Sequence, residues 1–319
     1  MSASTTDNTC SVFGKLIGKM MRHKDGNTKT RKLLVIGATV ACGAFLPMEA
    51  VADTATARHS EKPFTVCSFN MRTDCGADKG ELAWTNRLPR VLKIIEDHRL
   101  DVIGAQELKE NQVAHLREAL GPKGYKMVGR GRLAEGKSEG VYILYDGKRF
   151  ACTASDTFQL SETPDVWGSS SWNSAYPRTC VWVQLKDRET DKVFRLYNTH
   201  LDHVSELARR KGMELVVGRI NADVSAGTTA FLTGDFNNEL RPGNAIDYVR
   251  KSMSDTTELS LTPHQGPVNT FQAYQRPLSL IDYVFVKGKV RVFSHATIDD
   301  KPDGKWVSDH FPVVVTVAL

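Results

Sequence analysis

The sequence predicts a protein of the α/β class, because short β-prone runs that end in polar residues alternate with amphipathic helical patterns. Residues 229–233 form one such run, and the polar residues Asp235 and Asn237 follow it closely. Apolar side chains over residues 213–224 recur at helical spacing just before that run. Because α/β sheets gather functional groups at the carboxyl ends of buried strands, we expect a site at these strand ends.

Residues 1–52 have the features of a secretory signal peptide. A basic segment at residues 29–32 precedes a 14-residue apolar core over residues 33–46. Ala50-Val51-Ala52 then has the small-x-small form of a cleavage site. The apolar core is shorter than the roughly 20 residues that a membrane-spanning helix needs.

We therefore expect cleavage after Ala52 and export of the chain to the periplasm or out of the cell. A tether over residues 53–62 and a single domain over residues 63–319 would follow the cleavage site. The alternatives are an uncleaved anchor and a lipoprotein attached at Cys42.

Without the predicted leader the chain is close to neutral. The whole chain has 42 Lys and Arg against 37 Asp and Glu, and residues 1–52 hold seven of the basic and three of the acidic side chains, which leaves 35 against 34. A neutral chain has no general attraction to nucleic acid. Of the four remaining cysteines, Cys67 and Cys180 lie in β-like runs and are predicted to be small buried apolar groups, while disulfide pairing stays open.

The first predicted strand, residues 64–70, ends at Asn70, and an amphipathic helix over residues 88–95 follows it. The next strand, residues 101–107, is apolar and ends in Glu107. A carboxylate at the end of a buried strand needs a partner, and a divalent cation is a suitable one. The alternatives are an ordinary turn residue for the asparagine and a surface salt bridge for the glutamate.

A helix and a strand are predicted over residues 111–120 and 125–129. A polar loop then leads to Glu139, which is either a site residue or a solvated loop glutamate. Residues 158–177 form a long loop rich in aromatic residues, and we expect it to pack as a lip beside the site. Arg178 closes this loop. Its guanidinium could take two phosphate oxygens at once, and a structural ion pair is equally compatible with its position.

A strand over residues 193–200 delivers Asn198 and His200 to one face, because alternate side chains of a strand point the same way. An isolated histidine is more often a hydrogen-bonded structural residue than a functional one. Asp235 and Asn237 are also two residues apart, and they face the same way if the strand geometry persists. The alternative is a turn in which both side chains cap backbone amides.

Asp282 is embedded among the apolar residues of a strand over residues 280–286. An unpaired carboxylate there would cost several kcal/mol, so we expect a fixed partner, for which His310 is the candidate. The run Ser-Asp-His-Phe-Pro at residues 308–312 opens the last predicted strand, residues 313–317.

Six short motifs, in this order, resemble those of the endonuclease/exonuclease/phosphatase superfamily. They lie at Asn70, Glu107, residues 198–201, residues 234–237, Asp282 and residues 308–312. The Ser-Asp-His-x-Pro run is the most specific of these markers, and the resemblance covers residues 64–317. It implies a four-layer sandwich of two mixed β-sheets with helices outside, and it implies hydrolysis of phosphate esters.

The resemblance also implies a metal site and an attacking water. Glu107 and Asp309, with Asn70 beside them, would supply hard oxygen ligands for Mg²⁺ or Mn²⁺. Asp235 would orient or deprotonate the water, and Asn237 would hold that water or a phosphoryl oxygen.

Two histidines complete the set that the resemblance implies. His310, held in one tautomer by Asp282, would act as a general base or stabilise the pentavalent state as a cation. His200 would hydrogen-bond the phosphate, with Glu139 and Asn198 as supporting residues. Whether His310 or Asp235 takes the proton from the water stays open.

The sequence does not name the substrate. The absence of a basic surplus, and of runs that interleave basic and aromatic residues, favours a small or lipid-like phosphomono- or diester over duplex DNA. A secreted endonuclease or exonuclease acting on DNA or RNA is the alternative, and a non-catalytic binding module on the same fold is the alternative of another class. We expect a monomer without an obligate protein partner. Zinc is disfavoured because the chain has no His-Glu-x-x-His or Cys-x-x-Cys spacing.

Overall fold

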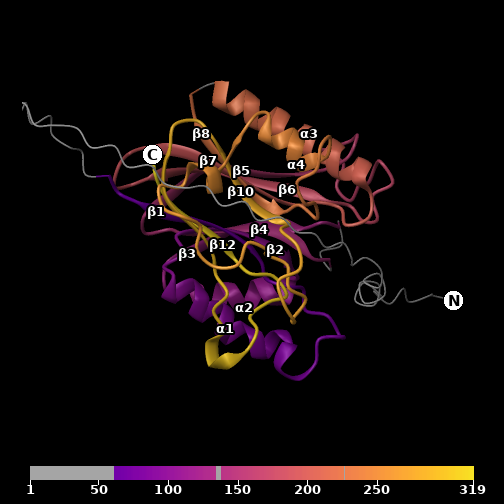
Figure 1. Ribbon diagram of the computed structural model, residues 1–319, viewed down its shortest axis with the longest axis vertical. Helices are drawn as coiled ribbons and strands as arrows, with labels where there is room; N and C mark the ends of the chain where they lie inside the picture. Colours follow the sequence, from indigo (N-terminus) through magenta and orange to yellow (C-terminus); the bar gives the residue numbers. More distant parts are fainter. Residues whose placement is uncertain (1–60, 134–137, 226) are drawn as a thin grey trace, which may run out of the picture. The chain divides into compact units, whose positions relative to one another are not determined.

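The structure is a computed structural model that describes residues 61–133, 138–225 and 227–319. The predicted signal peptide and its cleavage after Ala52 lie outside these residues and stay predictions. The described residues form two mixed β-sheets of six strands each (Figure 1). None of the described helices has the length and apolar character needed to cross a membrane.

The first sheet has the strand order β11-β12-β1-β2-β4-β3. Its strands are β1 (Phe64–Asn70), β2 (Val102–Leu108), β3 (Tyr125–Gly131), β4 (Gly140–Asp146), β11 (Arg291–Thr297) and β12 (Val313–Ala318). The second sheet has the order β5-β6-β7-β8-β10-β9. Its strands are β5 (Phe150–Gln159), β6 (Thr179–Asp187), β7 (Val193–His200), β8 (Thr229–Asp235), β9 (Ser254–Asp255) and β10 (Asp282–Lys287).

Helices cover the outer face of each sheet, at the bottom and the top of the view in Figure 1. The first sheet carries α1 (Trp84–Asp97) and α2 (Glu110–Leu120), and the second carries α3 (Glu206–Ser225) and α4 (Ala245–Arg250). Shorter elements are η2 (Gly80–Leu82), α5 (Thr256–Leu259) and η3 (Pro302–Gly304). One apolar cluster joins α1 and α2 to the first sheet and another joins α3 and α4 to the second. The predicted four-layer sandwich is therefore confirmed.

The strands are apolar on both faces because each sheet is covered on both sides. In β12, Val313, Val315 and Val317 belong to the core between the sheets, whereas Val314 belongs to the layer beneath α1 and α2. All four cysteines of the described domain are free thiols, and Cys67 and Cys180 are buried as predicted.

The two sheets repeat one arrangement of strands. In each sheet a single parallel pair, β1–β2 or β7–β8, is surrounded by antiparallel neighbours. A parallel pair needs a crossover connection, which α1 and α3 supply. The order β12-β1-β2-β4-β3 in one sheet thus corresponds to β6-β7-β8-β10-β9 in the other. The carboxyl ends of β1, β2, β7 and β8, which carry polar residues, lie next to one another.

Candidate active site

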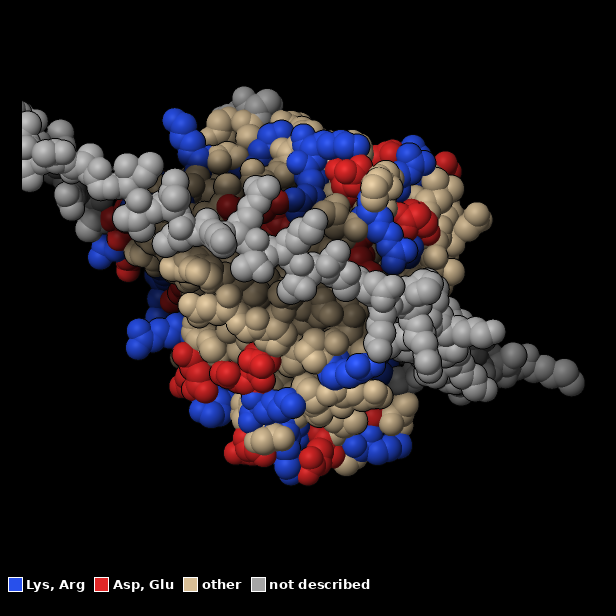
Figure 2. All heavy atoms as spheres, viewed as in Figure 1, with Lys and Arg blue, Asp and Glu red and all other residues tan. Residues whose placement is uncertain are grey.

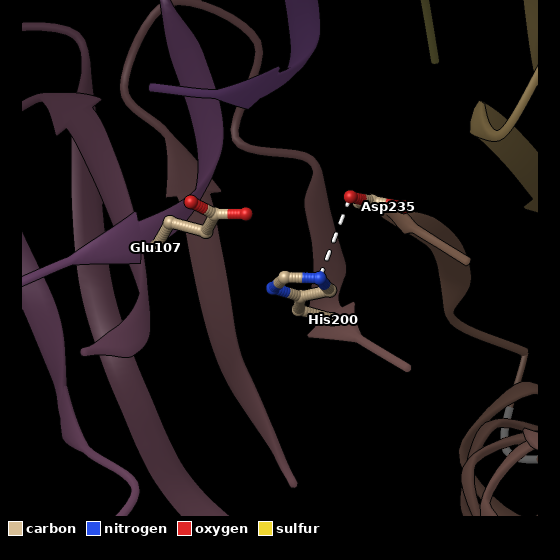
Figure 3. A group of neighbouring side chains, drawn as sticks. All are labelled: Glu107, His200 and Asp235. Atoms are coloured by element: carbon tan, nitrogen blue, oxygen red, sulfur yellow. Dashed lines mark ion pairs between the residues drawn. The ribbon is translucent and has the colours of Figure 1, made fainter. Parts of the chain in front are cut away.

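The side-chain amide of Asn70 joins the two sheets at the site. Its Nδ2 donates to Glu107 Oε1 at the end of β2 and to Asp235 Oδ2 at the end of β8, both at 3.0 Å. Asn70 and Asp235 are fully buried. Figure 3 shows Glu107, His200 and Asp235 facing one space from three different strands, and a dashed line marks the ion pair of 3.4 Å between His200 Nε2 and Asp235 Oδ2.

A β-bulge and a left-handed backbone conformation aim Glu107 into the site. The pairing of β2 with β4 shifts register between Ala105 and Leu108, and Glu107 has a φ of 66°. Bulges redirect side chains in this way, and left-handed residues other than glycine are uncommon and cluster at functional sites. Glu107 Oε2 accepts a further hydrogen bond from the backbone N–H of Thr73 at 3.0 Å.

The strand geometry ends at Asp235 and does not continue to Asn237, which decides between the two conformations that the sequence left open. Asn237 has a φ of 47°, and its backbone N–H donates to Asp235 Oδ1 at 2.9 Å. The segment is therefore the turn that the sequence left as an alternative. The turn still delivers Asn237 to the site, because its Nδ2 lies 3.0 Å from His200 Nε2 and donates to the carbonyl of Leu201.

His310 lies between two carboxylates. Its Nδ1 is 2.8 Å from Asp282 Oδ2, as expected, and its Nε2 is 3.7 Å from Asp235 Oδ2. Thr270 Oγ1 donates to the same Asp282 oxygen at 2.6 Å and fixes it. Burial alone would lower the pKa of His310, but the two aspartates outweigh burial and raise that pKa to about 10. The imidazole is therefore held as a cation.

The surroundings shift the pKa values of the remaining site groups in different directions. Burial and the nearby Asp282 raise the pKa of Asp235 above its ordinary value. Burial would also raise the pKa of Glu107, but His200 and Arg72 reverse the effect and lower it. Burial and then Arg178 lower the pKa of His200 well below its ordinary value.

Arg72 is a site residue that the sequence analysis missed. Its Nη1 lies 3.3 Å from Asp309 Oδ2, and its Nε lies 3.1 Å from Asp78 Oδ2. Burial raises the pKa of Asp309, and His310 and this guanidinium act against that shift. The only signal in the sequence is its place two residues after Asn70, at the end of an apolar strand.

Glu139 has partners other than the predicted His200. Its carboxylate pairs with Arg132, and Arg178 Nη1 lies 3.9 Å from the same oxygen, Oε1. Glu139 and His200 line the same small pocket, together with the two arginines and Glu107. Glu139 is therefore near His200, but its ion-pair partners are the arginines. Arg132 was also missed, since it lies in a polar loop where an arginine is unremarkable.

The aromatic loop between β5 and β6 packs beside this pocket, as expected of a lip. The Tyr176 ring stacks on His203 with 5.8 Å between ring centroids. Ser205 Oγ donates to the carbonyl of Trp172 at 2.7 Å, and Asp202 Oδ2 accepts from the backbone N–H of Ala175 at 3.0 Å. Asn198, a predicted supporting residue, is fully buried between the sheets and does not face the pocket residues.

The residues at this edge fit a hard divalent cation. Ligand atoms of Glu107, His200 and Asp235 all lie within 4.8 Å of one another. Two of these three groups are carboxylates, whose oxygens are the ligands that Mg²⁺ and Mn²⁺ prefer. A second group, Asp235, Asp282 and His310, meets the same distance criterion, but its histidine is already hydrogen-bonded to Asp282.

Carboxylates opposite imidazoles at one edge of two packed sheets suit the hydrolysis of phosphate esters by activated water. A profile of the Endonuclease/Exonuclease/phosphatase family matches residues 67–310, and the chain belongs to this family. Members of the family are phosphoester hydrolases, which confirms the predicted class of enzyme.

Three solved structures illustrate the similarity. An endonuclease/exonuclease/phosphatase from Bacteroides vulgatus is 32% identical with a TM-score of 0.74, and the alignment covers 81% of this chain and 100% of that one. A mannosyl-6-phosphatase from Bacteroides thetaiotaomicron is 30% identical with a TM-score of 0.73, over 80% of this chain and 100% of that one. Danio rerio TDP2, complexed with a single-strand DNA product, shares the fold at 16% identity and a TM-score of 0.62, over 81% and 100%. No match was found among curated protein sequences.

Proposed function

We propose that this protein is an exported, divalent-metal-dependent phosphoesterase that uses activated water to hydrolyse the P–O bond of a phosphomono- or diester. The observation that carries the proposal is the pair of carboxylate groups that Asn70 joins at 3.0 Å, Glu107 on one sheet and Asp235 on the other. Glu107 would bind a cation, and Asp235 would orient or deprotonate a water. Hydrolysis of a phosphate ester requires both a cation and an activated water.

Glu107 and Asp309, with Asn70 beside them, would hold the cation. A bound Mg²⁺ or Mn²⁺ neutralises charge on the phosphoryl oxygens and on the departing oxygen. Arg72 contacts Asp309 at 3.3 Å and would share this neutralising role. Enzymes of this family depend on a divalent metal, which supports the assignment.

The proton of the attacking water would go to Asp235. His310 lies between Asp282 at 2.8 Å and Asp235 at 3.7 Å, and an imidazole flanked by two carboxylates is already protonated. A protonated imidazole cannot accept the proton, but it can stabilise negative charge in the pentavalent state. Asn237 and His200, 3.0 Å apart, would hold the phosphoryl group or the water.

A panel of phosphomonoesters and phosphodiesters, including a sugar phosphate, sphingomyelin and DNA, tests the proposal. Hydrolysis of at least one ester with Mg²⁺, lost in excess chelator and restored by added metal, is the expected result. A protein inert toward the whole panel would indicate a non-catalytic binding module instead. Turnover that persists in fully metal-free protein would reject the metal assignment.

The name of the Bacteroides thetaiotaomicron relative supports a small phosphate ester, because mannosyl-6-phosphatase denotes a sugar phosphate substrate. A nuclease is the second candidate, and the DNA complex of TDP2 offers only a shared fold. On the face shown in Figure 2, basic and acidic side chains are interspersed.

Export rests on the sequence of the leader. We expect the mature protein, recovered from the periplasm or the medium, to begin at Asp53 when its N-terminus is sequenced. A full-length N-terminus on protein recovered from the cytoplasm would reject export.

A further inference from the structure

Two buried arginines from different sheets converge beside the phosphate-binding histidine. Arg132 directly follows β3 in the first sheet, and Arg178 directly precedes β6 in the second. Each is 7% exposed, and both line the small pocket that also contains His200 and Glu107. Guanidinium groups are costly to bury without a compensating anion, so each of these two arginines needs an anionic partner in this pocket.

The protein's own carboxylates satisfy these two arginines incompletely. Arg132 pairs with Glu139, but Arg178 lies 3.9 Å from that same carboxylate and 3.8 Å from Asp202 Oδ2. Both of the latter distances exceed hydrogen-bond length. Among the described residues, the Nε atoms of both arginines are buried without a hydrogen-bond acceptor. Buried donors without partners are rare in folded proteins and are typical of places where a ligand supplies the acceptor.

The two guanidinium groups and His200 line this pocket together with Glu107 and Glu139. Burial and then Arg178 lower the pKa of His200 and that of His203, and the nearby carboxylates, Glu107 at both rings and Asp202 at His203, act against that shift. An oxyanion placed between the arginines and His200 would supply the acceptors that the two buried Nε–H groups lack.

We propose that Arg132 and Arg178 bind the third non-bridging oxygen of a phosphomonoester dianion, and that the site thereby selects monoesters over diesters. A monoester presents three non-bridging oxygens and a double negative charge, whereas a diester carries carbon on the third oxygen. A diester would bury an alkoxy group against the two Nε–H donors and leave them without acceptors. The inference rests on the proposed function, because it requires that the phosphoryl group occupies the space next to Glu107 and His200.

The test uses two esters with one leaving group, p-nitrophenyl phosphate and bis(p-nitrophenyl) phosphate, at about pH 8, where the monoester is a dianion because its second pKa is about 6. In Arg132→Gln we expect kcat/KM to fall about 10- to 100-fold for the monoester and less than about threefold for the diester. Arg132→Lys keeps the charge without the fork and should fall in between. The matched control is Arg130→Gln, two residues earlier in β3 but exposed and stacked on Trp167, which should change neither value.

An equal loss on both esters, or no loss on either, would overturn the selective role of Arg132. Binding of inorganic phosphate and of dimethyl phosphate, measured by calorimetry on the wild-type protein, provides a readout that needs neither turnover nor a variant. Phosphate should bind at least about tenfold more tightly. Equal binding of the two anions would overturn the inference while leaving a phosphoesterase in place. Tighter binding of phosphate in a protein that hydrolyses no ester would keep the inference about the pocket and reject the proposed function.

Discussion

Asn70 has a larger part in the site than a position beside a metal implies. Its Nδ2 reaches carboxylates of both sheets, and its Oδ1 accepts from the backbone N–H of Arg72 at 2.9 Å. These three neighbours all carry ionisable side chains, yet the Asn70 side chain itself is neutral and fully buried. A neutral amide can hold two carboxylates near each other without adding a third charge to a buried site. Asn70 thus acts as a positioning residue for Glu107 and Asp235.

Removing the groups that handle the water or the developing charge should reduce turnover. For Asp235→Asn and for His310→Ala we expect kcat to fall on the order of 10²-fold or more, because one removes the proton acceptor and the other the imidazolium. Steady-state kinetics at saturating substrate measures the loss. The control is Asp165→Asn, which removes the same charge from a side chain that is 95% exposed and should leave kcat unchanged. Near-normal turnover of correctly folded His310→Ala would refute its role.

The sequence singled out those candidate site residues that are acids within otherwise apolar strands. Glu107 and Asp282 are acids in apolar strands, and burial of an acid demands a partner, so the sequence alone pointed to a function for each. Arg72 and Arg132 lie in polar stretches where a charged residue needs no explanation, so no local pattern singled them out. Asn237 was located correctly, although its turn conformation was given only as an alternative, because spacing alone does not fix φ.

At the scale of single elements, β7 stabilises the contact between the sheets through Asn198. This side chain donates to the carbonyls of Ala105 at 2.9 Å and Tyr142 at 3.0 Å, and it accepts from Gln106 Nε2 at 2.7 Å. We expect Asn198→Leu to lower the free energy of unfolding by about 3 kcal/mol, because it removes these three buried hydrogen bonds and a fourth, from Thr233 Oγ1 at 3.2 Å.

Urea denaturation of both the variant and a surface control measures this cost. Asn111→Leu changes the same residue type on the exposed face of α2, where Asn111 bonds Asp74, and should stay within about 0.5 kcal/mol of wild type. A loss for Asn198→Leu no larger than that of the control would show that the sheets do not depend on this side chain.

His295 in the edge strand β11 (Arg291–Thr297) pairs with His264, which lies outside that strand, and this pair makes stability depend on pH. His295 Nδ1 lies 2.9 Å from His264 Nδ1, and its Nε2 lies 3.1 Å from Thr257 Oγ1. One proton fits between the two Nδ1 atoms, so the two rings cannot both be cations. Burial and then His264 lower the pKa of His295 from 6.5 to about 4.

Because the folded pKa of His295 is depressed, its contribution is present above pH 6.5 and is lost as the pH falls toward 4. Between these values we expect the wild type to lose about 3 kcal/mol more unfolding free energy than His295→Gln, which cannot titrate. Denaturant unfolding at a series of pH values measures both slopes. Parallel pH dependence in the two proteins would contradict the depressed pKa.

The long elements were predictable and the pairing of strands was not. Alternating or continuous apolar runs mark β1, β2, β7, β8 and β12 in the sequence, because both of their faces are buried. Such runs report burial but carry no information about which strand lies alongside, so the assignment to two sheets came only from the family resemblance. The two-residue strand β9 and the four-residue helix α5 are too short to leave any periodicity.

At the scale of the whole molecule, the active site exists because two similar sheets approach each other closely at equivalent strand ends. Gly104 on β2 marks this approach. A Cβ atom added there would lie 2.1 Å from Thr233 Oγ1 and 2.7 Å from Asn198 Oδ1, both on the opposite sheet. Any larger residue must therefore push the sheets apart near the point where Asn70 reaches across to Asp235.

We expect Gly104→Ala to lower the free energy of unfolding by about 1–3 kcal/mol through overpacking, and to lower kcat as well, because separating the sheets lengthens the Asn70 bridge. Gly218→Ala is the matched control. A Cβ at Gly218 meets nothing within 4 Å, and alanine inside helix α3 should raise stability by up to about 1 kcal/mol. Adding Thr233→Ala to Gly104→Ala removes the nearest obstructing atom, so the double variant should lose less stability than the sum of the two single losses. Strictly additive losses, or a Gly104→Ala protein as stable as wild type, would mean that the spacing of the sheets does not set the geometry of the site.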